Sequence, residues 1–191
     1  MSPAEPAAAR ARALSELPTL AAQTVQMLHT PQAMFGLGLD EAKVVVGYMH
    51  AVAFPRGATL LREGDGRDTA EMLFLLEGEV SVDGGTLRPS GGVPIASLGP
   101  GNVLGEVALL DGQPRSAQCT ALSPVRAAGL TRAALQRLLD EHPKVAAKLM
   151  IALVQRITER VRGMGQQLQM YGELTASLQA ELDRLRGTGR R

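Results

Sequence analysis

Hydrophobic residues are spaced for helices at both ends of the chain and for short strands in the middle. Near the N-terminus, apolar residues recur every three or four positions, which predicts a helix over residues 11–29. Residues 1–10, rich in alanine and proline, are expected to be disordered. Asp40 can cap a second helix that runs through Ala51, because its carboxylate can accept hydrogen bonds from unpaired first-turn amides. The apolar face of the first helix is expected to comprise Leu14, Leu17, Ala21, Val25 and Leu28.

The residue pattern changes after Phe54, where short apolar runs alternate with turn residues. Closely spaced runs of this kind predict a compact all-β unit, so the expected fold class is mainly β. Residues 83–94 hold four glycines and two prolines and are expected to form a mobile hairpin loop. The expected strands are residues 58–61, 72–76, 80–82, 95–98, 117–122 and 125–130.

Helical spacing returns after the last strand. Thr131 suits the N-cap of a helix over residues 132–140, and Pro143 suits the first position of another helix. From Met150 onward, apolar residues are spaced alternately four and three apart, a heptad stripe typical of a coiled coil. We therefore predict a homodimer formed through residues 150–185. The stripe comprises Met150, Val154, Ile157, Val161, Met164, Leu168, Tyr171, Thr175, Leu178, Leu182 and Leu185.

An alternative for this region is a long helix folded back on its own domain. Gly163, Gly165 and Gly172 each disfavour a helix by about 1 kcal/mol relative to alanine, and they could also mark a flexible joint.

Composition limits the kind of protein. The 191 residues, 45% hydrophobic, suit one globular domain with extensions, and a net charge of +1 disfavours general binding to nucleic acid or to anionic membranes. The single cysteine, Cys119, lies in an apolar run and reads as a buried thiol in a reducing compartment. No apolar stretch reaches the roughly 20 residues that cross a bilayer, and the start lacks a secretory apolar region. We expect a cytoplasmic protein without a membrane partner.

The most informative segment is residues 105–117, GEVALLDGQPRSA. It strongly resembles the phosphate-binding cassette of cyclic-nucleotide-binding domains, the family of the catabolite activator protein and of kinase regulatory subunits. The resemblance covers about residues 35–162: residues 54–64 look like the family's opening strands, and residues 75–82 like its next hairpin. It implies a jelly-roll-like β-barrel flanked by helices, with cAMP or cGMP as the ligand.

Each part of a cyclic nucleotide has a matching residue in this segment. Gly105 lets ligand and backbone approach closely, and the amides through Val107 and Ala108 open a short helix that offers donors to an anion. Glu106 can accept the ribose 2′-hydroxyl proton. Arg115 offers a planar fork of donors to the phosphate, which the Ser116 hydroxyl and the Ala117 amide can complete.

Two points stay open. Glu106 and Arg115 could form only a surface salt bridge, worth at most about 1 kcal/mol. By resemblance, Arg160 and Val161 belong to the lid over the base, but Arg160 could stack on a purine or simply flank the coiled coil. Ser116 fits relatives of either nucleotide, so cAMP is favoured over cGMP only modestly, and a cyclic dinucleotide is a further possibility.

The expected organisation is an N-terminal extension (residues 1–34), the nucleotide-binding domain (35–142), a lid helix continuing into the coiled coil (143–186) and a tail (187–191). Only GTGRR follows Arg186, so we expect a stand-alone member without the helix-turn-helix of bacterial relatives, and DNA binding is disfavoured. His29, His50 and His142 are far apart in the sequence and do not have the spacing of metal ligands. No nucleophile–base pair stands out either, so we expect no enzyme activity, no catalytic residues, no catalytic cofactor and no metal site. The predicted function is a cyclic-nucleotide sensor that signals to an unidentified protein effector through its lid helix. The alternative is a coiled-coil scaffold whose nucleotide pocket is unoccupied.

Overall fold

The computed structural model describes residues 12–29, 36–66, 70–84 and 96–188. The chain divides into two compact units, of which the first ends at Leu153 and the second begins at Val154. The disorder predicted for residues 1–10 lies outside the described residues. Of the loop predicted for residues 83–94, residues 83 and 84 instead end a strand, and residues 85–94 lie outside the described residues.

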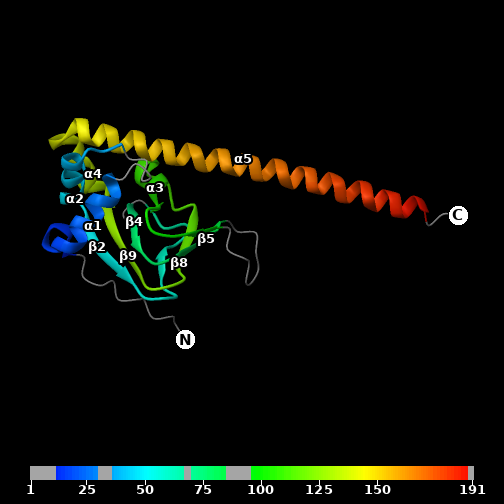
Figure 1. Ribbon diagram of the computed structural model, residues 1–191, viewed down its shortest axis with the longest axis horizontal. Coiled ribbons are helices and arrows are strands. Elements are labelled where there is room, and N and C mark those ends of the chain that lie inside the picture. Colours follow the sequence, from blue (N-terminus) through cyan, green and yellow to red (C-terminus); the bar gives the residue numbers. More distant parts are fainter. Residues whose placement is uncertain (1–11, 30–35, 67–69, 85–95, 189–191) are drawn as a thin grey trace. The chain divides into compact units, whose positions relative to one another are not determined.

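Two antiparallel sheets form the centre of the first unit (Figure 1). Hydrogen bonds among the described strands do not close the two sheets into a barrel, so the predicted jelly-roll-like fold is confirmed in an open form. The first sheet has the strand order β1 (Arg12–Ala13), β2 (His50–Phe54), β9 (Val125–Thr131), β4 (Glu71–Glu77) and β7 (Val103–Leu104). The second has the order β3 (Thr59–Leu61), β8 (Ala117–Ala121), β5 (Val80–Gly84) and β6 (Ala96–Leu98).

Strand β4 separates two hydrophobic layers. Its residues alternate between them, as the period of two in a strand requires: Met72, Phe74 and Leu76 join the cluster that contains the helices. Leu73 and Leu75 join a second cluster, which includes Val80, Cys119 and Ala121 from the second sheet. The run MLFLL is therefore buried on both faces, which explains why it lacks polar residues.

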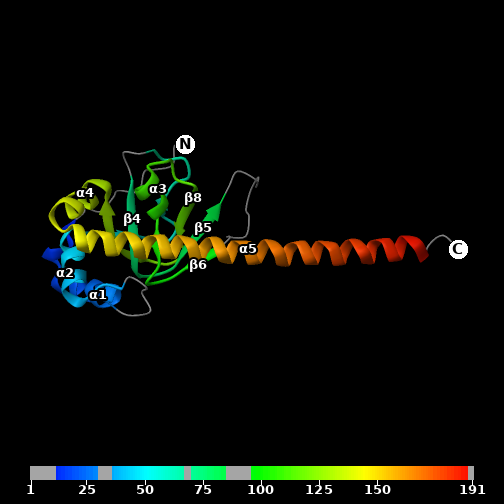
Figure 2. The ribbon, with the colours of Figure 1, turned by 90° about the horizontal axis from the view of Figure 1, so that it is seen from above.

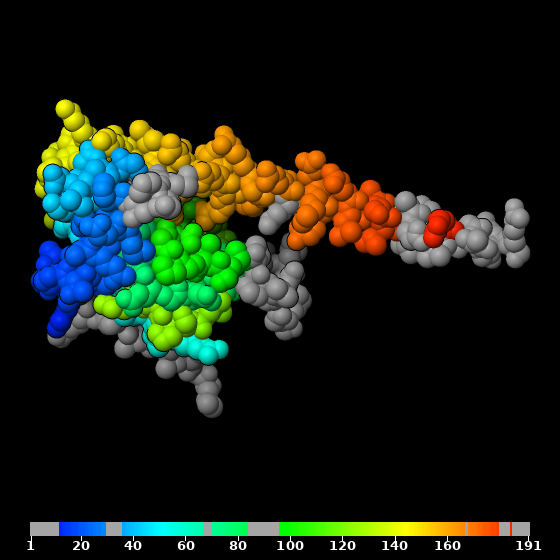
Figure 3. Space-filling view, in the orientation of Figure 1, coloured from blue at the N-terminus to red at the C-terminus, as the bar shows by residue number. Residues whose placement is uncertain are grey.

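The N-terminal region differs from the predicted continuous helix. Residues 12–13 add strand β1 to the edge of the first sheet, a 3₁₀ turn η1 (Leu14–Glu16) follows, and helix α1 spans Pro18–His29. Helix α1 lies beside helix α2 (Leu39–Gly47), as Figure 2 shows. Their side chains, blue to light blue in Figure 3, together cover one part of this unit.

Helix α2 ends earlier than predicted and is capped differently. Gly38 is the N-cap, and its amide donates to the Glu41 carboxylate at 2.8 Å, whereas Asp40 instead pairs with Lys43. The helix stops at Gly47 because residues 50–54 form strand β2, each residue of which pairs with β9. The helix itself is confirmed, but its predicted extension to Ala51 is wrong, since strand pairing in the sheet overrides local periodicity.

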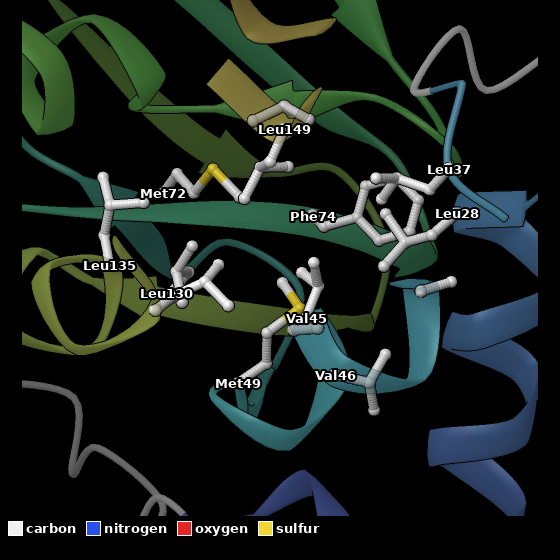
Figure 4. Packing of buried hydrophobic residues seen from close by; sticks show 14 of the residues in the cluster. Leu28, Leu37, Val45, Val46, Met49, Met72, Phe74, Leu130, Leu135 and Leu149 are labelled. Carbon is white, nitrogen blue, oxygen red and sulfur yellow. The ribbon is translucent and has the colours of Figure 1, made fainter. Parts of the chain in front are cut away.

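Two helices follow the last strand, as predicted. Thr131 caps α4 (Arg132–Glu141), because its Oγ1 accepts from the Ala134 amide at 3.2 Å. Pro143 begins α5 (Pro143–Thr188). The first turns of α5 contribute Ala146, Leu149 and Leu153 to the hydrophobic cluster that contains the helices. Figure 4 shows Leu149 of α5 facing Met72 of β4 in this cluster.

Polar contacts also join the helices of the first unit. The Tyr48 hydroxyl, just after α2, donates to the Glu141 carboxylate of α4 at 2.5 Å. The Lys148 ammonium of α5 pairs with the Glu41 carboxylate of α2 at 2.6 Å. The start of α5 is thus tied to α2 as well as to the sheet.

In the second unit, α5 continues unbroken through Gly163, Gly165 and Gly172. Most of the predicted heptad stripe whose side chains the structure describes is exposed in the single chain, including Val161, Met164 and Leu168. Within the described part of the chain, no helix combines the length and the apolar character needed to cross a bilayer.

Candidate functional site

The segment singled out in the sequence forms a short helix bracketed by two glycines. Gly105, with φ +75°, precedes α3 (Glu106–Asp111), and Gly112, with φ +67°, ends it. These left-handed backbone conformations favour glycine at both positions. The first amides of a helix lack acceptors within it, so the start of α3 presents donors beside Gly105.

Arg115 reaches back from the end of this segment to the start of α3. Its Nη1 donates to the Gly105 carbonyl at 2.9 Å, and its Nη2 donates to the Glu71 carbonyl at 2.7 Å. The side chain is 5% exposed. Burial lowers the pKa of Arg115, while the nearby charges of Glu71 and Asp65 act in the opposite direction. Because a guanidinium keeps its charge across ordinary pH, a buried cation lies at the N-terminal end of α3.

The backbone of Arg115 is fixed as firmly as its side chain. Its amide donates to the Asp65 carbonyl at 3.0 Å, and its carbonyl accepts from the Gly64 amide at 2.9 Å. These bonds attach the arginine to the turn that follows β3. The guanidinium therefore has a defined position before any ligand arrives.

Gly105 has no room for a side chain. A Cβ on this residue would collide with the Arg115 guanidinium and would lie 2.8 Å from the Glu71 carbonyl oxygen. The absence of a side chain at Gly105 thus allows Arg115 to approach the start of α3.

Comparisons with known proteins agree with this geometry. The family model described as the cyclic nucleotide-binding domain matches residues 51–142. A solved cyclic nucleotide-binding domain from Methylobacillus flagellatus is 34% identical, with a TM-score of 0.67, and the match covers 76% of this chain and 80% of that one. The chain belongs to the cyclic nucleotide-binding domain family.

Longer proteins carry related domains. A CRP-like cAMP-activated global transcriptional regulator of Mycobacterium tuberculosis is 29% identical over 57% of this chain and 47% of its own length. A cyclic nucleotide-gated potassium channel of Mesorhizobium japonicum is 37% identical over 53% of this chain and 26% of its own. The chain thus spans less than half the length of either relative.

Within this cyclic nucleotide-binding domain, the structure brings most of the predicted cassette residues together around α3. Glu106, 3% exposed, is the first residue of the helix, with half-buried Val107 and buried Ala108 behind it. Ser116 is exposed and Ala117 is half-buried, directly after Arg115. Since Glu106 and Arg115 are both buried, the alternative of an exposed surface salt bridge does not describe them.

The predicted lid residues lie elsewhere in the chain. Arg160 and Val161 belong to the second unit, on α5, and both side chains are exposed. Their contact with a base stays a prediction.

Two residues that hold Arg115 and α3 in place were missed in the sequence. Glu71 takes part through its backbone carbonyl, which no pattern of side chains could indicate. Arg132, the first residue of α4, donates to the Leu109 carbonyl at 2.9 Å. Its place directly after the predicted cap Thr131 was visible, but the meeting of α3 with α4 depends on the tertiary fold. Among the described residues, no three His, Cys, Asp or Glu side chains gather as a metal ion would require.

Proposed function

We propose that this chain is a cyclic-nucleotide sensor that binds cAMP and reports the binding to a partner protein. The observation that carries the proposal is the buried guanidinium of Arg115, fixed by two backbone carbonyls beside the start of α3. A buried cation next to helix amides suits an anion of phosphate size. The site's role is regulatory rather than catalytic in this proposal.

Different cassette residues bind different parts of the ligand in this proposal. Arg115 and the first amides of α3 bind the cyclic phosphate, with Ser116 and Ala117 completing its hydrogen bonds, while Glu106 accepts from the ribose 2′-hydroxyl. The buried position of Glu106 at the start of α3 supports this role, because a hydrogen bond to an ionised carboxylate is stronger away from water. The proposed ligand-binding residues are Gly105, Glu106, Val107, Ala108, Arg115, Ser116 and Ala117.

The base is the less constrained part of the ligand. The mycobacterial relative is named as cAMP-activated, which supports cAMP here, with cGMP as the competing ligand. Arg160 and Val161 are the proposed lid residues, and stacking of the Arg160 guanidinium on a purine would contribute about 0.5 to 2 kcal/mol.

The output of the sensor is proposed to use α5. The exposed apolar stripe of its second unit supports a homodimer through residues 150–185, because single chains rarely leave such a seam in water. The effector is a further protein, not DNA. The buried free thiol of Cys119 suits the reducing cytoplasm as the site of action.

Titration calorimetry of the full chain against cAMP, cGMP and cyclic dinucleotides tests this function, together with thermal melting at high ligand excess. Binding of cAMP is expected, and a ligand at 100 times its Kd should stabilise the fold by about 2.7 kcal/mol. Tighter binding of cGMP would change the ligand but keep the function. No heat and no melting shift with any nucleotide would favour the scaffold alternative, which the exposed stripe of α5 also supports.

A further inference from the structure

The C-terminal end of α3 is held by an arginine from the next helix. Arg132 Nη2 donates to the Leu109 carbonyl at 2.9 Å and lies 3.5 Å from the Ala108 carbonyl. The last carbonyls of a helix have no donors within it, and they form the negative end of its dipole. Arg132 therefore supplies both the missing donor and a matching charge to the cassette helix.

Gly112 makes room for this guanidinium. A Cβ on Gly112 would lie 2.9 Å from both Nη1 and Nη2 of Arg132. The Gly112 amide donates to the Ala108 carbonyl at 3.0 Å and closes the helix. The Arg132 side chain thus lies directly against the turn that ends α3.

The backbone of Arg132 belongs to a different element. It is the first residue of α4, and its amide donates to the Ala70 carbonyl at 3.1 Å, just before β4. Leu109 of α3 and Leu135 of α4 are also members of one buried cluster. Arg132 therefore begins α4 and contacts the end of α3, so its side chain links the two helices directly.

We propose that Arg132 is a positioning residue that couples α3 to α4, so that a displacement of the cassette by the nucleotide is passed to α4 through this guanidinium. The inference rests on the proposed function, because a nucleotide must first bind at the other end of α3. Arg115 contacts the N-terminal end of α3 and Arg132 its C-terminal end. A movement of α3 relative to Arg115 would therefore displace the Arg132 side chain together with the helix.

Hydrogen exchange of the α4 amides, with and without saturating cAMP, measures the coupling in the full chain, and calorimetry gives the affinity in parallel. We expect Arg132→Ala to bind cAMP within about tenfold of the parent but to lose most of the nucleotide-induced change in α4 exchange. Arg132→Lys should restore part of the change, because an ammonium can still donate to the Leu109 carbonyl. The matched control is Arg126→Ala, which removes an exposed arginine that pairs with Glu77 at 3.1 Å, and it should respond like the parent.

The possible results separate the two proposals. If the parent binds no nucleotide, the proposed function fails and this inference falls with it. If the parent binds and Arg132→Ala shows the parent's full change in α4 exchange, or if the parent itself shows no change, the coupling role alone is overturned. A purely structural role would raise α4 exchange equally in the free and bound states and leave their difference intact. Should Arg132→Ala not fold, comparison of Arg132→Lys with Arg132→Gln decides, with the smaller response expected for the uncharged side chain.

Discussion

The guanidinium of Arg115 lies beside the Cα of Gly105, where the side chain of any other residue would begin, and donates to the Gly105 carbonyl at 2.9 Å. The two residues are ten positions apart in the chain and define one corner of the candidate site. Their roles can be tested separately, because one supplies the charge and the other supplies the space.

Gly105→Ala should weaken cAMP binding by more than tenfold. The new Cβ would push the Arg115 guanidinium away from the start of α3, and φ +75° is strained for alanine. Gly57→Ala is the matched control, since Gly57 has φ +83° and no heavy atom near its Cβ position. Both variants should lose about 1 to 3 kcal/mol of stability in urea unfolding, but only Gly105→Ala should lose affinity by calorimetry. Equal cAMP affinities for the two variants would contradict the role given to Gly105.

Arg115→Ala should reduce cAMP affinity about 30-fold to several-thousand-fold, since loss of one partner of a buried charge pair costs about 2 to 5 kcal/mol. Circular dichroism below the melting temperature establishes that the variant is folded. Arg115→Lys should recover only part of the affinity, because an ammonium cannot donate to two carbonyls and a phosphate in a fixed fork. A folded Arg115→Ala that binds cAMP as tightly as the parent would overturn the assignment of the site.

The thiol of Cys119 should be unreactive in the folded protein. Burial raises its pKa to about 11 from 9.0, although the charge of Arg115 acts in the opposite direction. At pH 8 this shift lowers the thiolate fraction about a hundredfold, and the thiolate is the reactive form. Alkylation by iodoacetamide should therefore be at least that much slower than in urea-unfolded protein.

The same shift predicts a pH effect on stability. Between pH 9 and about 11 the unfolded chain loses the thiol proton that the folded chain retains, so the free energy of unfolding falls as pH rises through this window. Cys119→Ala should show a smaller fall over the same range. An identical pH profile for the parent and the variant would count against the raised pKa.

Leu168→Lys should dissociate the proposed homodimer. Leu168 is 70% exposed in the single chain and lies on the heptad stripe, where a charge would have to be buried between the two helices. Met170→Lys is the control, because Met170 is 58% exposed on the same helix but off the stripe. Sedimentation equilibrium should show a monomer for the first variant and a dimer for the second, whereas equal masses would remove the argument from the stripe.

Local signals in the sequence were sufficient to predict the short helix α3 and the two helices that follow β9. The turn glycines, the short apolar helix and Arg115 are contiguous in the chain, and Thr131 caps α4 through its own side chain. These features need few distant partners. The predicted strands within residues 58–61, 72–76 and 117–122 also appear, because strong apolar runs between turns leave few alternatives.

The errors fall where distant segments decide the structure. Residues 48–51 continue an apolar helical pattern, yet β9 recruits residues 50–54 as strand β2. The two residues of β7 are too few for a pattern and depend on pairing with β4. Likewise, the contact between Arg132 and the end of α3 joins residues more than 20 positions apart. Sequence periodicity does not indicate such contacts between distant segments.

Two hydrogen-bond acceptors of the Arg115 guanidinium are backbone carbonyls, at Gly105 and Glu71. A backbone carbonyl survives almost any substitution at its own position, so this hydrogen bond at residue 71 does not require a glutamate there. The position of Arg115 depends instead on the pairing register of β4 with β9 and on a glycine at position 105. Related chains could therefore keep the same position of this guanidinium with few identical residues around it.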